Sequence, residues 1–492
     1  MICRGGAREM TRPVSRLDVR RLVCLVAAIV FVAGFVAVQS RPAAAAVTVA
    51  TGDPRNVGQP VVPGTCTALT STLAYPSSRT FTTAQETTPP DTARIQAALS
   101  SCAGSGHAVE LKASGSSNAF LTGPLTIGSS VTLLIDAGVT LVASRNPANY
   151  QVSGGATCGT VASKGGACKP LITISGSNSG LMGTQSGGHQ GLIDGRGDID
   201  ILGTSTTWWA LAEAARSGGS QNNPRLVQSN GVDNTTIFDL SLTRGPNFHI
   251  VMNGGTGFTA WGVRILTPAT ARNTDGIDPS GTDVTIANSF IEDGDDGVAI
   301  KGGSHASQNI TVENNFFWGT HGISIGSETN AGVSNVLFKN NTLNGKDSSG
   351  NTSGSDDGIR IKSDESRGGL VTTVTYNATC TTAIKFPLTF NPFYTTATGS
   401  LIPNFQNIVV NGMRSVSSVS SASSLLEGFS SSVPLGLTLE NVQLDATKVT
   451  AQNARIAVFN TNLSPSGTGV TVSSFTGTGS VPSCSFPAFP GL

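Results

Sequence analysis

Short strand-forming runs recur at a fixed interval in the middle of the chain. Runs of β-branched and aromatic residues at 284–286, 310–312 and 336–338 begin 26 residues apart, after an earlier run at 235–238. No helical pattern separates them, and each run is too short for a strand of a sandwich. Two or three short strands in each turn of 20 to 26 residues are what a β-helix solenoid needs. The sequence therefore predicts an all-β solenoid.

Composition agrees with this prediction. The chain has 59 glycines, 12% charged and 6% aromatic residues, and many serines, threonines and asparagines, which favours β structure with many turns over helical bundles. The 38% hydrophobic content argues against a disordered chain. Asparagine pairs at 314–315 and 340–341 suit tight turns between strands, because asparagine tolerates left-handed conformations and can form ladders.

A solenoid also needs covered ends. Asp91 followed by Ile95, Ala98 and Leu99 predicts an N-cap and a short amphipathic helix that closes the N-terminal end. Residues 205–216 predict a second helical excursion, on the wall of the solenoid. No linker calls for a second domain, so a single domain is predicted over residues 47–492.

The first 46 residues have the pattern of an export signal. Arginines precede an apolar run at 22–38, and alanines follow at 43–46. An uncleaved membrane anchor is the alternative, but the small residues favour cleavage near Ala46. We therefore expect a signal peptide at 1–46 and a secreted, extracellular protein that has no membrane association after cleavage.

Removing the signal changes the charge balance. Residues 1–46 hold seven arginines and two acids, so the rest of the chain has 23 basic and 28 acidic residues, a net charge of −5. This weighs against nucleic acid as a partner. A polyanionic substrate would need a local basic cleft.

Six cysteines remain, which suits disulfides in an exported protein. The sequence leaves their pairing open, with the sequential pairs Cys66–Cys102, Cys158–Cys168 and Cys380–Cys484 as the first candidates. No cysteine spacing suits zinc, and the five histidines are scattered. We expect no metal and no cofactor.

Chemistry-bearing residues recur at about the length of one coil. Asp275 and Asp295 are 20 residues apart, and Asp296 and His321 are 25 apart, so a solenoid would place them side by side on one face. Asp295 and Asp296 are adjacent, and the flanking glycines would let both face one cleft. Glycosidic hydrolysis needs one protonated carboxyl and a second group that activates water or attacks carbon. Crowding of like charges raises one pKa and supplies the neutral acid.

Cations belong to the same pattern. In the run 358–362 the isoleucines point inward, so Arg360 and Lys362 project together from the outer face. Lys301 ends the first run of this series, at 297–301, and is assigned to the same binding role. Acids beside cations suit the hydrolysis of an acidic sugar polymer.

Three other readings of these residues exist. Asp-Asp-Gly is a common turn sequence, and residues 356–358 repeat it without a catalytic role. Aspartate clusters also bind calcium, as in the pectate lyases that use β-helices. The Arg-Gly-Asp triplet at 196–198 is found in cell-adhesion ligands, although its glycines favour a turn.

Four segments in order and spacing resemble the signatures of the polygalacturonases, glycoside hydrolase family 28. They are Asn-Thr-Asp-Gly at 273–276, Gly-Asp-Asp at 294–296, His-Gly at 321–322 and Arg-Ile-Lys at 360–362. Residues 246–249 and 324–328 also look like those of bacterial secreted members. Thr320 stands where glycine is usual, and Gly297 where cysteine or asparagine is frequent.

The resemblance implies a right-handed parallel β-helix and inverting hydrolysis of α-1,4-linked galacturonic acid. We further expect a monomer that acts on demethylated pectin, since Arg360 and Lys362 suit a free carboxylate, and we expect endo action, although the sequence does not settle endo against exo. The resemblance implies these roles: Asp295 as general acid, Asp275 and Asp296 holding and activating water, His321 tuning the acid, Arg360 and Lys362 gripping the galacturonate carboxylate, Asn273 supporting the cleft, and Tyr394 binding sugar. The alternatives are exo action, xylogalacturonan or rhamnogalacturonan specificity, a calcium-dependent pectate lyase-like enzyme, and a carbohydrate-binding solenoid without catalysis.

Overall fold

The computed structural model describes residues 49–492, which lie within one compact unit. The predicted signal peptide at 1–46 lies outside these residues. Within the described part of the chain, no helix is both long and apolar enough to cross a membrane.

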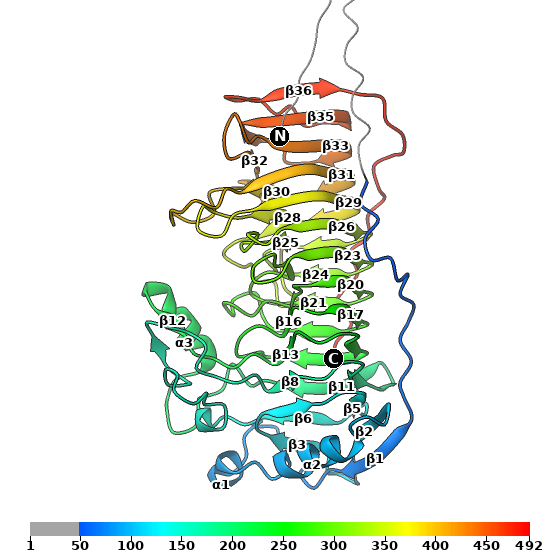
Figure 1. The fold of residues 1–492 in the computed structure, drawn as a ribbon, viewed down its shortest axis with the longest axis vertical. Coiled ribbons are helices and arrows are strands. Elements are labelled where there is room, and N and C mark those ends of the chain that lie inside the picture. The colour runs from blue at the N-terminus through cyan, green and yellow to red at the C-terminus, as the bar shows by residue number, and fades with distance from the viewer. Residues whose placement is uncertain (1–48) are drawn as a thin grey trace, which may run out of the picture. The chain divides into compact units, whose positions relative to one another are not determined.

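The strands of this unit form three parallel ladders, and within each ladder the strands of successive coils lie one above the next (Figure 1). The first ladder is β1 (Thr65–Thr70), β2 (His107–Lys112), β5 (Val131–Ile135), β9 (Gly180–Gly183), β14 (Thr236–Phe238), β17 (Thr256–Trp261), β20 (Thr282–Ala287), β23 (Ser307–Glu313), β26 (Val333–Lys339), β29 (Leu370–Thr382), β31 (Asn404–Val416), β33 (Leu435–Leu444), β35 (Ala454–Thr461) and β36 (Thr471–Ser474). The second is β3 (Ala119–Thr122), β6 (Thr140–Ala143), β11 (His189–Asp194), β15 (Leu240–Thr243), β18 (Arg264–Leu266), β21 (Phe290–Glu292), β24 (Phe316–Trp318) and β27 (Thr342–Asn344), and it merges into the second half of β29.

The third ladder carries the chemistry described below. It is β4 (Leu125–Ile127), β8 (Ile172–Ile174), β13 (Val227–Asn230), β16 (Ile250–Asn253), β19 (Ile277–Asp278), β22 (Val298–Ile300), β25 (Ile323–Ile325), β28 (Asp357–Lys362), β30 (Phe386–Asn391), β32 (Ser424–Glu427) and β34 (Val449–Gln452). The predicted fold class, a right-handed parallel β-helix, is confirmed.

Stacked aliphatic columns form the core. Val284, Ile310 and Val336 pair in successive coils, and all three side chains are fully buried. The next member of this column is Val374, 38 residues after Val336, because a loop between β27 and β28 lengthens that coil. This insertion ends the 26-residue interval seen in the sequence.

An asparagine ladder supports one corner of the coil, as the sequence predicted. The side-chain oxygen Oδ1 of Asn315 accepts from the Ser289 backbone N–H at 2.9 Å, and Oδ1 of Asn341 accepts from the Asn315 backbone N–H at 3.1 Å. Asn314 and Asn340, one residue earlier in each coil, have positive φ angles of 56° and 53°. Buried backbone groups at this corner are thereby satisfied where no strand pairs them.

Helices lie at the N-terminal end and on the wall. In α2 (Thr92–Cys102), Ile95 and Leu99 are fully buried against the first coils (Figure 1). Asp91 is the N-cap residue of α2, as predicted, but its side chain makes no capping hydrogen bond, because the carboxylate accepts from the Leu121 backbone N–H and from Arg94. Two further short helices are α1 (Thr83–Thr87) and α3 (Trp208–Ala214), and single 3₁₀ turns form at Pro147–Asn149 and Ala215–Ser217.

The α3 segment is the predicted excursion on the wall. It lies beside a small two-stranded pairing of β7 (Val161–Ala162) with β12 (Ser220–Gln221), away from the stack (Figure 1). A separate short strand, β10 (Gln185–Ser186), forms a hairpin with β11. The three sequential disulfides predicted from the sequence are all present, and Cys158–Cys168 closes a loop in this excursion.

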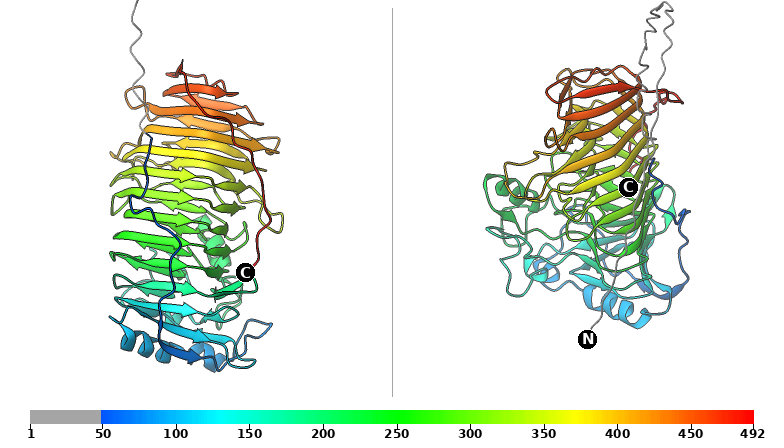
Figure 2. Two further views of the ribbon diagram at one scale, coloured as in Figure 1. Left: turned by 90° about the vertical axis from the view of Figure 1, so that its right-hand side faces the viewer. Right: turned by 45° about the horizontal axis from the view of Figure 1, so that its top comes forward.

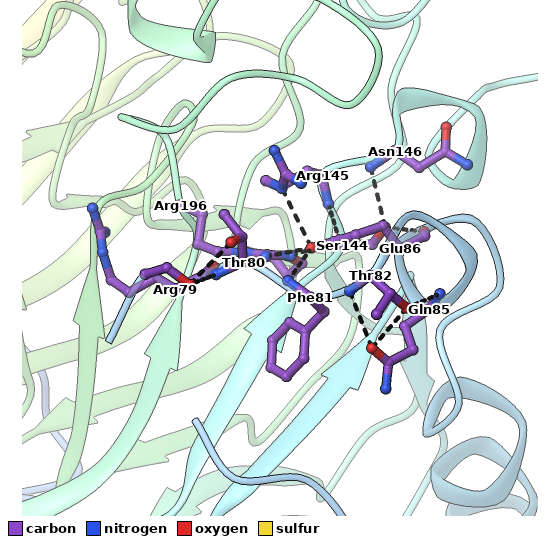
Figure 3. Close-up of polar contacts among 12 residues, drawn as sticks. Arg79, Thr80, Phe81, Thr82, Gln85, Glu86, Ser144, Arg145, Asn146 and Arg196 are labelled. Carbon is purple, nitrogen blue, oxygen red and sulfur yellow. Dashed lines mark hydrogen bonds and ion pairs between the residues drawn. The ribbon is translucent and has the colours of Figure 1, made fainter. Parts of the chain in front are cut away.

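A buried ion pair fixes α1 to the first coils. Arg196 donates to both oxygens of Glu86 at 2.7 and 2.9 Å, and Arg145 contacts the same carboxylate (Figure 3). Neither Arg196 nor Glu86 exposes any of its side chain. The cell-adhesion reading of the triplet at 196–198 is therefore wrong, since its arginine is inaccessible.

Two extended segments run along the stack (Figure 2). Near the N-terminal end of the described chain, Asp53 accepts from Thr285 and its backbone N–H donates to Thr311, two residues of successive coils. Near the C-terminus, Phe489 packs edge-on against Trp318 at a centroid distance of 5.3 Å. These segments tie several coils together across long sequence separations.

Candidate active site

All nine predicted site residues line one cleft of about 670 Å³. They lie in the loops that enter or leave the third ladder, or on its strand β28. They are Asn273, Asp275, Asp295, Asp296, Lys301, His321, Arg360, Lys362 and Tyr394. The in-phase spacing in the sequence thus does bring these side chains together.

Glycines on both sides of the acid pair are required by close packing. A Cβ on Gly294 would collide with the Ala271 backbone, and one on Gly297 with the Phe317 ring. Neither glycine has a positive φ, so the freedom expected from the sequence is not what selects them. The pair lies in the loop that joins β21 of the second ladder to β22 of the third, and both aspartates line the cleft there.

Both oxygens of the Asp295 carboxylate have nitrogen atoms within hydrogen-bonding distance. His321 Nδ1 is 3.0 Å from Asp295 Oδ1, and the backbone and side-chain nitrogens of Asn273 are each 3.3 Å from Oδ2. Asn273 has a φ of 56°, a left-handed conformation that asparagine tolerates. Burial alone raises the pKa of Asp295, but the charges of His321, Lys362 and Arg360 bring it below its usual range.

Asp296 is held still more firmly. Lys362 Nζ lies 2.7 Å from its Oδ2, Ser324 donates to Oδ1 at 2.8 Å, and Arg360 is 3.5 Å away. Burial raises the pKa of Asp296, while Lys362 and then Arg360 lower it to a value below normal. Asp296 is therefore an anion whose two oxygens are both engaged.

Asp275 has the opposite character. Its side chain is buried, and Oδ1 has no hydrogen-bond partner. Burial, followed by repulsion from Asp278 and Asp295, raises the pKa of Asp275 well above its usual value. Burial and crowding do raise the pKa of one of the three predicted acids, as the sequence suggested, but in the free protein that acid is Asp275, while the pKa of Asp295 is lowered.

Lys301 lines the same cleft and has several partners. It donates to the Gly326 carbonyl oxygen at 3.1 Å and lies 3.9 Å from Asp278 and 3.8 Å from Glu328. The pKa of Lys301 is raised, because these and neighbouring acids outweigh the effect of burial. Its ammonium therefore already neutralises part of the acidic floor of the cleft.

Arg360 and Lys362 form the cationic side of the cleft. Arg360 Nε and Nη1 have no hydrogen-bond partner, so the guanidinium has donors to spare. The ring of Tyr394 covers both cations, with its centroid 5.3 Å from Arg360 Cζ and 4.9 Å from Lys362 Nζ. The Tyr394 side chain remains partly exposed, which leaves it open to a ligand.

Sequence reasoning missed Asp278, Ser324 and Asp357. Asp357, in the look-alike Asp-Asp-Gly, is not remote from the site, because it lies 3.5 Å from Arg360 and accepts from Thr389 at 2.6 Å. The repeated strand pattern of the third ladder could have identified Asp278 and Ser324. Asp278, Ser324 and Arg360 occupy equivalent positions, each two residues after a glycine, and their strands pair in that register.

A divalent cation fits this site poorly. One ligand atom each from Asp295, Asp296 and His321 lie within 4.8 Å of one another. Both oxygens of Asp296 are, however, engaged by Lys362 and Ser324, and two cationic side chains adjoin them. Calcium takes about six to eight oxygen ligands, which these residues do not offer.

Asp278→Asn should stabilise the protein in a pH-dependent way. Burial is the main cause that raises the pKa of Asp278 to about 7, so ionising it in the folded state costs free energy. The cost is absent below the unfolded pKa, near 3.8, and complete above the folded value. It amounts to at most about 4 kcal/mol, at 1.36 kcal/mol per pKa unit.

We therefore expect a higher melting temperature for Asp278→Asn at pH 8 and little change at pH 4, measured by thermal denaturation followed by circular dichroism. An equal gain at both pH values would show that charge is not the cause.

Known proteins are similar to this chain in sequence and in fold. The model of the family Glycosyl hydrolases family 28 matches residues 120–464. A polygalacturonase of Ralstonia nicotianae is 39% identical over 454 residues, covering 82% of this chain and 82% of the relative. An endo-polygalacturonase of Pectobacterium carotovorum subsp. carotovorum is 39% identical over 397 residues, covering 80% of this chain and 90% of the relative.

A solved structure agrees in both sequence and fold. The polygalacturonase from Erwinia carotovora ssp. carotovora superposes with a TM-score of 0.71 and 37% identity, covering 82% of this chain and 99% of that one. The family match spans most of the coil and includes all of the site residues described above. The chain therefore belongs to family 28 of the glycosyl hydrolases, as a glycoside hydrolase of the polygalacturonase group.

Proposed function

We propose that this protein is a secreted, endo-acting polygalacturonase that hydrolyses α-1,4 bonds of demethylated pectin with inversion, from a single catalytic domain at 47–492. One observation carries the proposal. Three buried or half-buried aspartates meet two cations with spare donor capacity in a single open cleft. The predicted signal and the three disulfides support export.

Arg360 and Lys362 bind the carboxylate of the galacturonate residue beside the scissile bond. Arg360 offers Nε and Nη1, and the ammonium of Lys362 uses one of its three protons on Asp296. Tyr394 covers both cations and supplies a surface for the sugar ring. A methyl ester would remove the charge that this pair recognises.

Asp295 protonates the leaving oxygen. In the free protein the pKa of Asp275 is raised by burial, whereas His321 and the cations keep the pKa of Asp295 low, so Asp275 is the acid that more readily holds a proton. An arriving carboxylate draws Arg360 and Lys362 to itself and adds a negative charge, and both effects raise the pKa of Asp295. Substrate binding thus favours transfer of the proton from Asp275 to Asp295, which leaves Asp275 as a base.

Asp275 and Asp296 hold and activate the attacking water. Direct attack by Asp296 on carbon is disfavoured, because Lys362, Ser324 and Arg360 engage both of its oxygens. One oxygen each of Asp295 and Asp296 lie within 4.8 Å, which taken alone resembles the shorter separation of retaining enzymes. The inverting course rests on the family resemblance and is checked by the anomer of the first product, observed by proton NMR.

Endo action is supported by the continuation of the cleft. A second groove shares Phe248, Arg272 and Asn273 with it, so a polymer can extend past the acids instead of ending there. The Pectobacterium relative that is 39% identical is named as an endo-polygalacturonase. An internal cut needs room for sugars on both sides of the scissile bond.

We expect the protein without its signal to hydrolyse polygalacturonate at an undiminished rate in EDTA. A reducing-end assay with product sizes resolved over time is the measurement, and early products of mixed length would support endo action. Activity that EDTA abolishes and calcium restores, with a product absorbing in the ultraviolet, would identify a lyase. Release of one product size from the start would identify an exo-acting enzyme.

A further inference from the structure

The loop that lengthens one coil, between β27 and β28, borders the catalytic cleft. It consists of residues 345–356, the cleft loop, of which Thr352, Gly354 and Ser355 line the cleft together with His321 and Arg360. The cleft loop contains no hydrophobic residue. Apolar packing therefore cannot hold it in place, and its position depends on polar contacts.

Glu292, the last residue of β21, holds the start of the cleft loop. Its Oε2 accepts from the Ser348 backbone N–H at 2.7 Å, and its Oε1 accepts from the Ser348 hydroxyl at 3.0 Å. Glu292 is buried, and hydrogen bonds are stronger away from water. Since Asp295 follows Glu292 by three residues, these bonds attach the cleft loop to the coil that carries Asp295.

Asp347 attaches the cleft loop to a second coil. Its Oδ2 accepts from the Ala269 backbone N–H at 3.1 Å and from the Asn351 side chain at 3.0 Å. Its Oδ1 accepts from the backbone N–H groups of Ser349 and Asn351 at 3.0 and 2.7 Å. Asp347 is buried, and Ala269 lies in the loop that leads to Asp275. The second attachment is therefore to the coil of Asp275.

The cleft loop also packs against the coil of His321, at Gly319. A Cβ on Gly319 would lie only 2.7 Å from the Ala269 Cβ and 3.0 Å from the Asp347 Cβ, and the φ of Gly319 is 64°. Both the close approach and the positive φ call for glycine at this position. The cleft loop thus reaches back over the His321 coil to the coils of Asp275 and Asp295.

The far end of the cleft loop contacts a neighbour of Arg360, the cation proposed to bind the substrate carboxylate. The Ser355 hydroxyl donates to Asp357 Oδ2 at 2.6 Å, and this oxygen is 3.5 Å from Arg360 Nη1. Arg360 Nη1 also lies 3.5 Å from Asp296. Two contacts therefore link the position of the cleft loop to the placement of the guanidinium.

We propose that Glu292 and Asp347 are positioning residues, which fold the cleft loop back over three coils and so make it a fixed side of the catalytic cleft next to Arg360. The proposal rests on the proposed function of this cleft. A side that is in place before binding needs no ordering by the substrate. When these contacts are lost, only the fraction of molecules with the loop in place binds well, and KM rises by the inverse of that fraction.

The hydrogen bonds of the two carboxyls predict different results for their amide variants. Both oxygens of Asp347 accept from nitrogen donors, so an asparagine NH₂ group would face a donor in either orientation. The Ser348 hydroxyl can donate or accept, so glutamine in place of Glu292 can accept from the backbone N–H and donate to the hydroxyl. Burial raises the pKa of Glu292 to about 7, so a neutral group is close to the native one. Asp347→Asn should release the cleft loop, and Glu292→Gln should not.

The kinetic test compares Asp347→Asn, Glu292→Ala and Glu292→Gln on polygalacturonate. The first two are expected to raise KM about tenfold, the value for a loop in place in about one molecule in ten. Glu292→Gln should restore the KM that Glu292→Ala loses. Glu313→Ala, which changes an acid at the end of β23 that lines neither groove, is the matched control.

The kcat separates positioning of the loop from damage to the acids. Among residues 49–492, no residue of the cleft loop forms a hydrogen bond or ion pair with Asp295 or Asp296. The kcat of all the variants should therefore stay within about threefold of the wild type. A lower kcat with an unchanged KM would overturn the proposal, as would a raised KM for Glu292→Gln equal to that of Glu292→Ala.

Hydrogen–deuterium exchange of a peptide that spans 345–356 measures the loop without turnover. Exchange there should be faster in Asp347→Asn and Glu292→Ala than in the wild type and Glu292→Gln, with equal exchange in the other coils as the sign of an intact fold. Equal exchange in all four proteins would overturn the proposal. Faster exchange with an unchanged KM would do the same, because the loop would then not act on the substrate.

A binding experiment distinguishes this proposal from the proposed function. Calorimetric titration of an oligogalacturonate measures affinity in the absence of detectable hydrolysis. Weaker binding by Asp347→Asn than by Glu292→Gln supports the positioning role even if the wild type hydrolyses no polygalacturonate. Equal binding by these two variants rejects it even if hydrolysis by the wild type is normal.

Discussion

Replacing Asp295 with asparagine should lower kcat on polygalacturonate by more than about 10⁴-fold. A single acid–base group typically contributes about 10²–10⁴-fold to the rate. Removing one member of a set of groups that act as a unit costs more than this, because the other members lose their function with it. Asparagine keeps the shape of Asp295 but cannot carry the proton. A reducing-end assay at raised enzyme concentration, with circular dichroism to verify folding, measures the effect.

The same substitution should also cost stability at neutral pH. The folded pKa of Asp295 is lowered, so its ionised form stabilises the fold above the unfolded value near 3.8, and that contribution is lost as pH falls through the folded value. The amide would in addition face two donor nitrogens of Asn273. Asp295→Asn should therefore melt below the wild type at pH 7, with a smaller difference near pH 3.

Asp283→Asn is the matched control. Asp283 has a φ of 56°, which asparagine tolerates, accepts one hydrogen bond from Asn309 and lines neither groove. Its variant should retain turnover and stability at both pH values. Near-normal turnover by Asp295→Asn, or loss of turnover by Asp283→Asn, would contradict our assignment of the acid.

The strand positions were predictable from the sequence in the part of the solenoid where each coil has the same number of residues. Val284, Ile310 and Val336 stand 26 residues apart because each coil between them contains the same three strands and corners. The interval fails once a loop enlarges the coil before β28, since nothing in the strand pattern fixes loop length. The wall excursion was visible through its tryptophans, but its place beside the cleft depends on chain geometry that no local pattern encodes.

The members of the site were more predictable than their charges. Period-two alternation was enough to place Arg360 and Lys362 on one face. Which acid has the raised pKa was not predictable, because it depends on which acid has a partner. Asp296 and Asp295 receive cations and donors, whereas Asp275 Oδ1 has none. That difference arises from contacts between coils and from a buried neighbour, Asp278, which sequence reasoning missed.

Lys362→Met should reduce kcat/KM on polygalacturonate by about 10³-fold. Lys362 is proposed to make two charge-assisted contacts, one to Asp296 at 2.7 Å and one to the substrate carboxylate. Contacts of this kind are worth about 1.5–3 kcal/mol each, and about 1.4 kcal/mol is a factor of ten. On highly methylated pectin the loss should be smaller, because only the contact to Asp296 remains to be lost.

The pH profile gives this variant a second readout. Lys362 is the first of the charges that lower the pKa of Asp296, so its removal raises that pKa and Asp296 becomes protonated at higher pH. Since the anion is the form that holds water, the acidic limb of the Lys362→Met profile should move to higher pH than in the wild type. Lys385→Met, which removes a lysine that lies 5.0 Å from the Phe386 ring and lines neither groove, should leave rate and profile unchanged. Equal losses on methylated and demethylated substrate, with an unmoved acidic limb, would mean that Lys362 supports the fold and not the substrate.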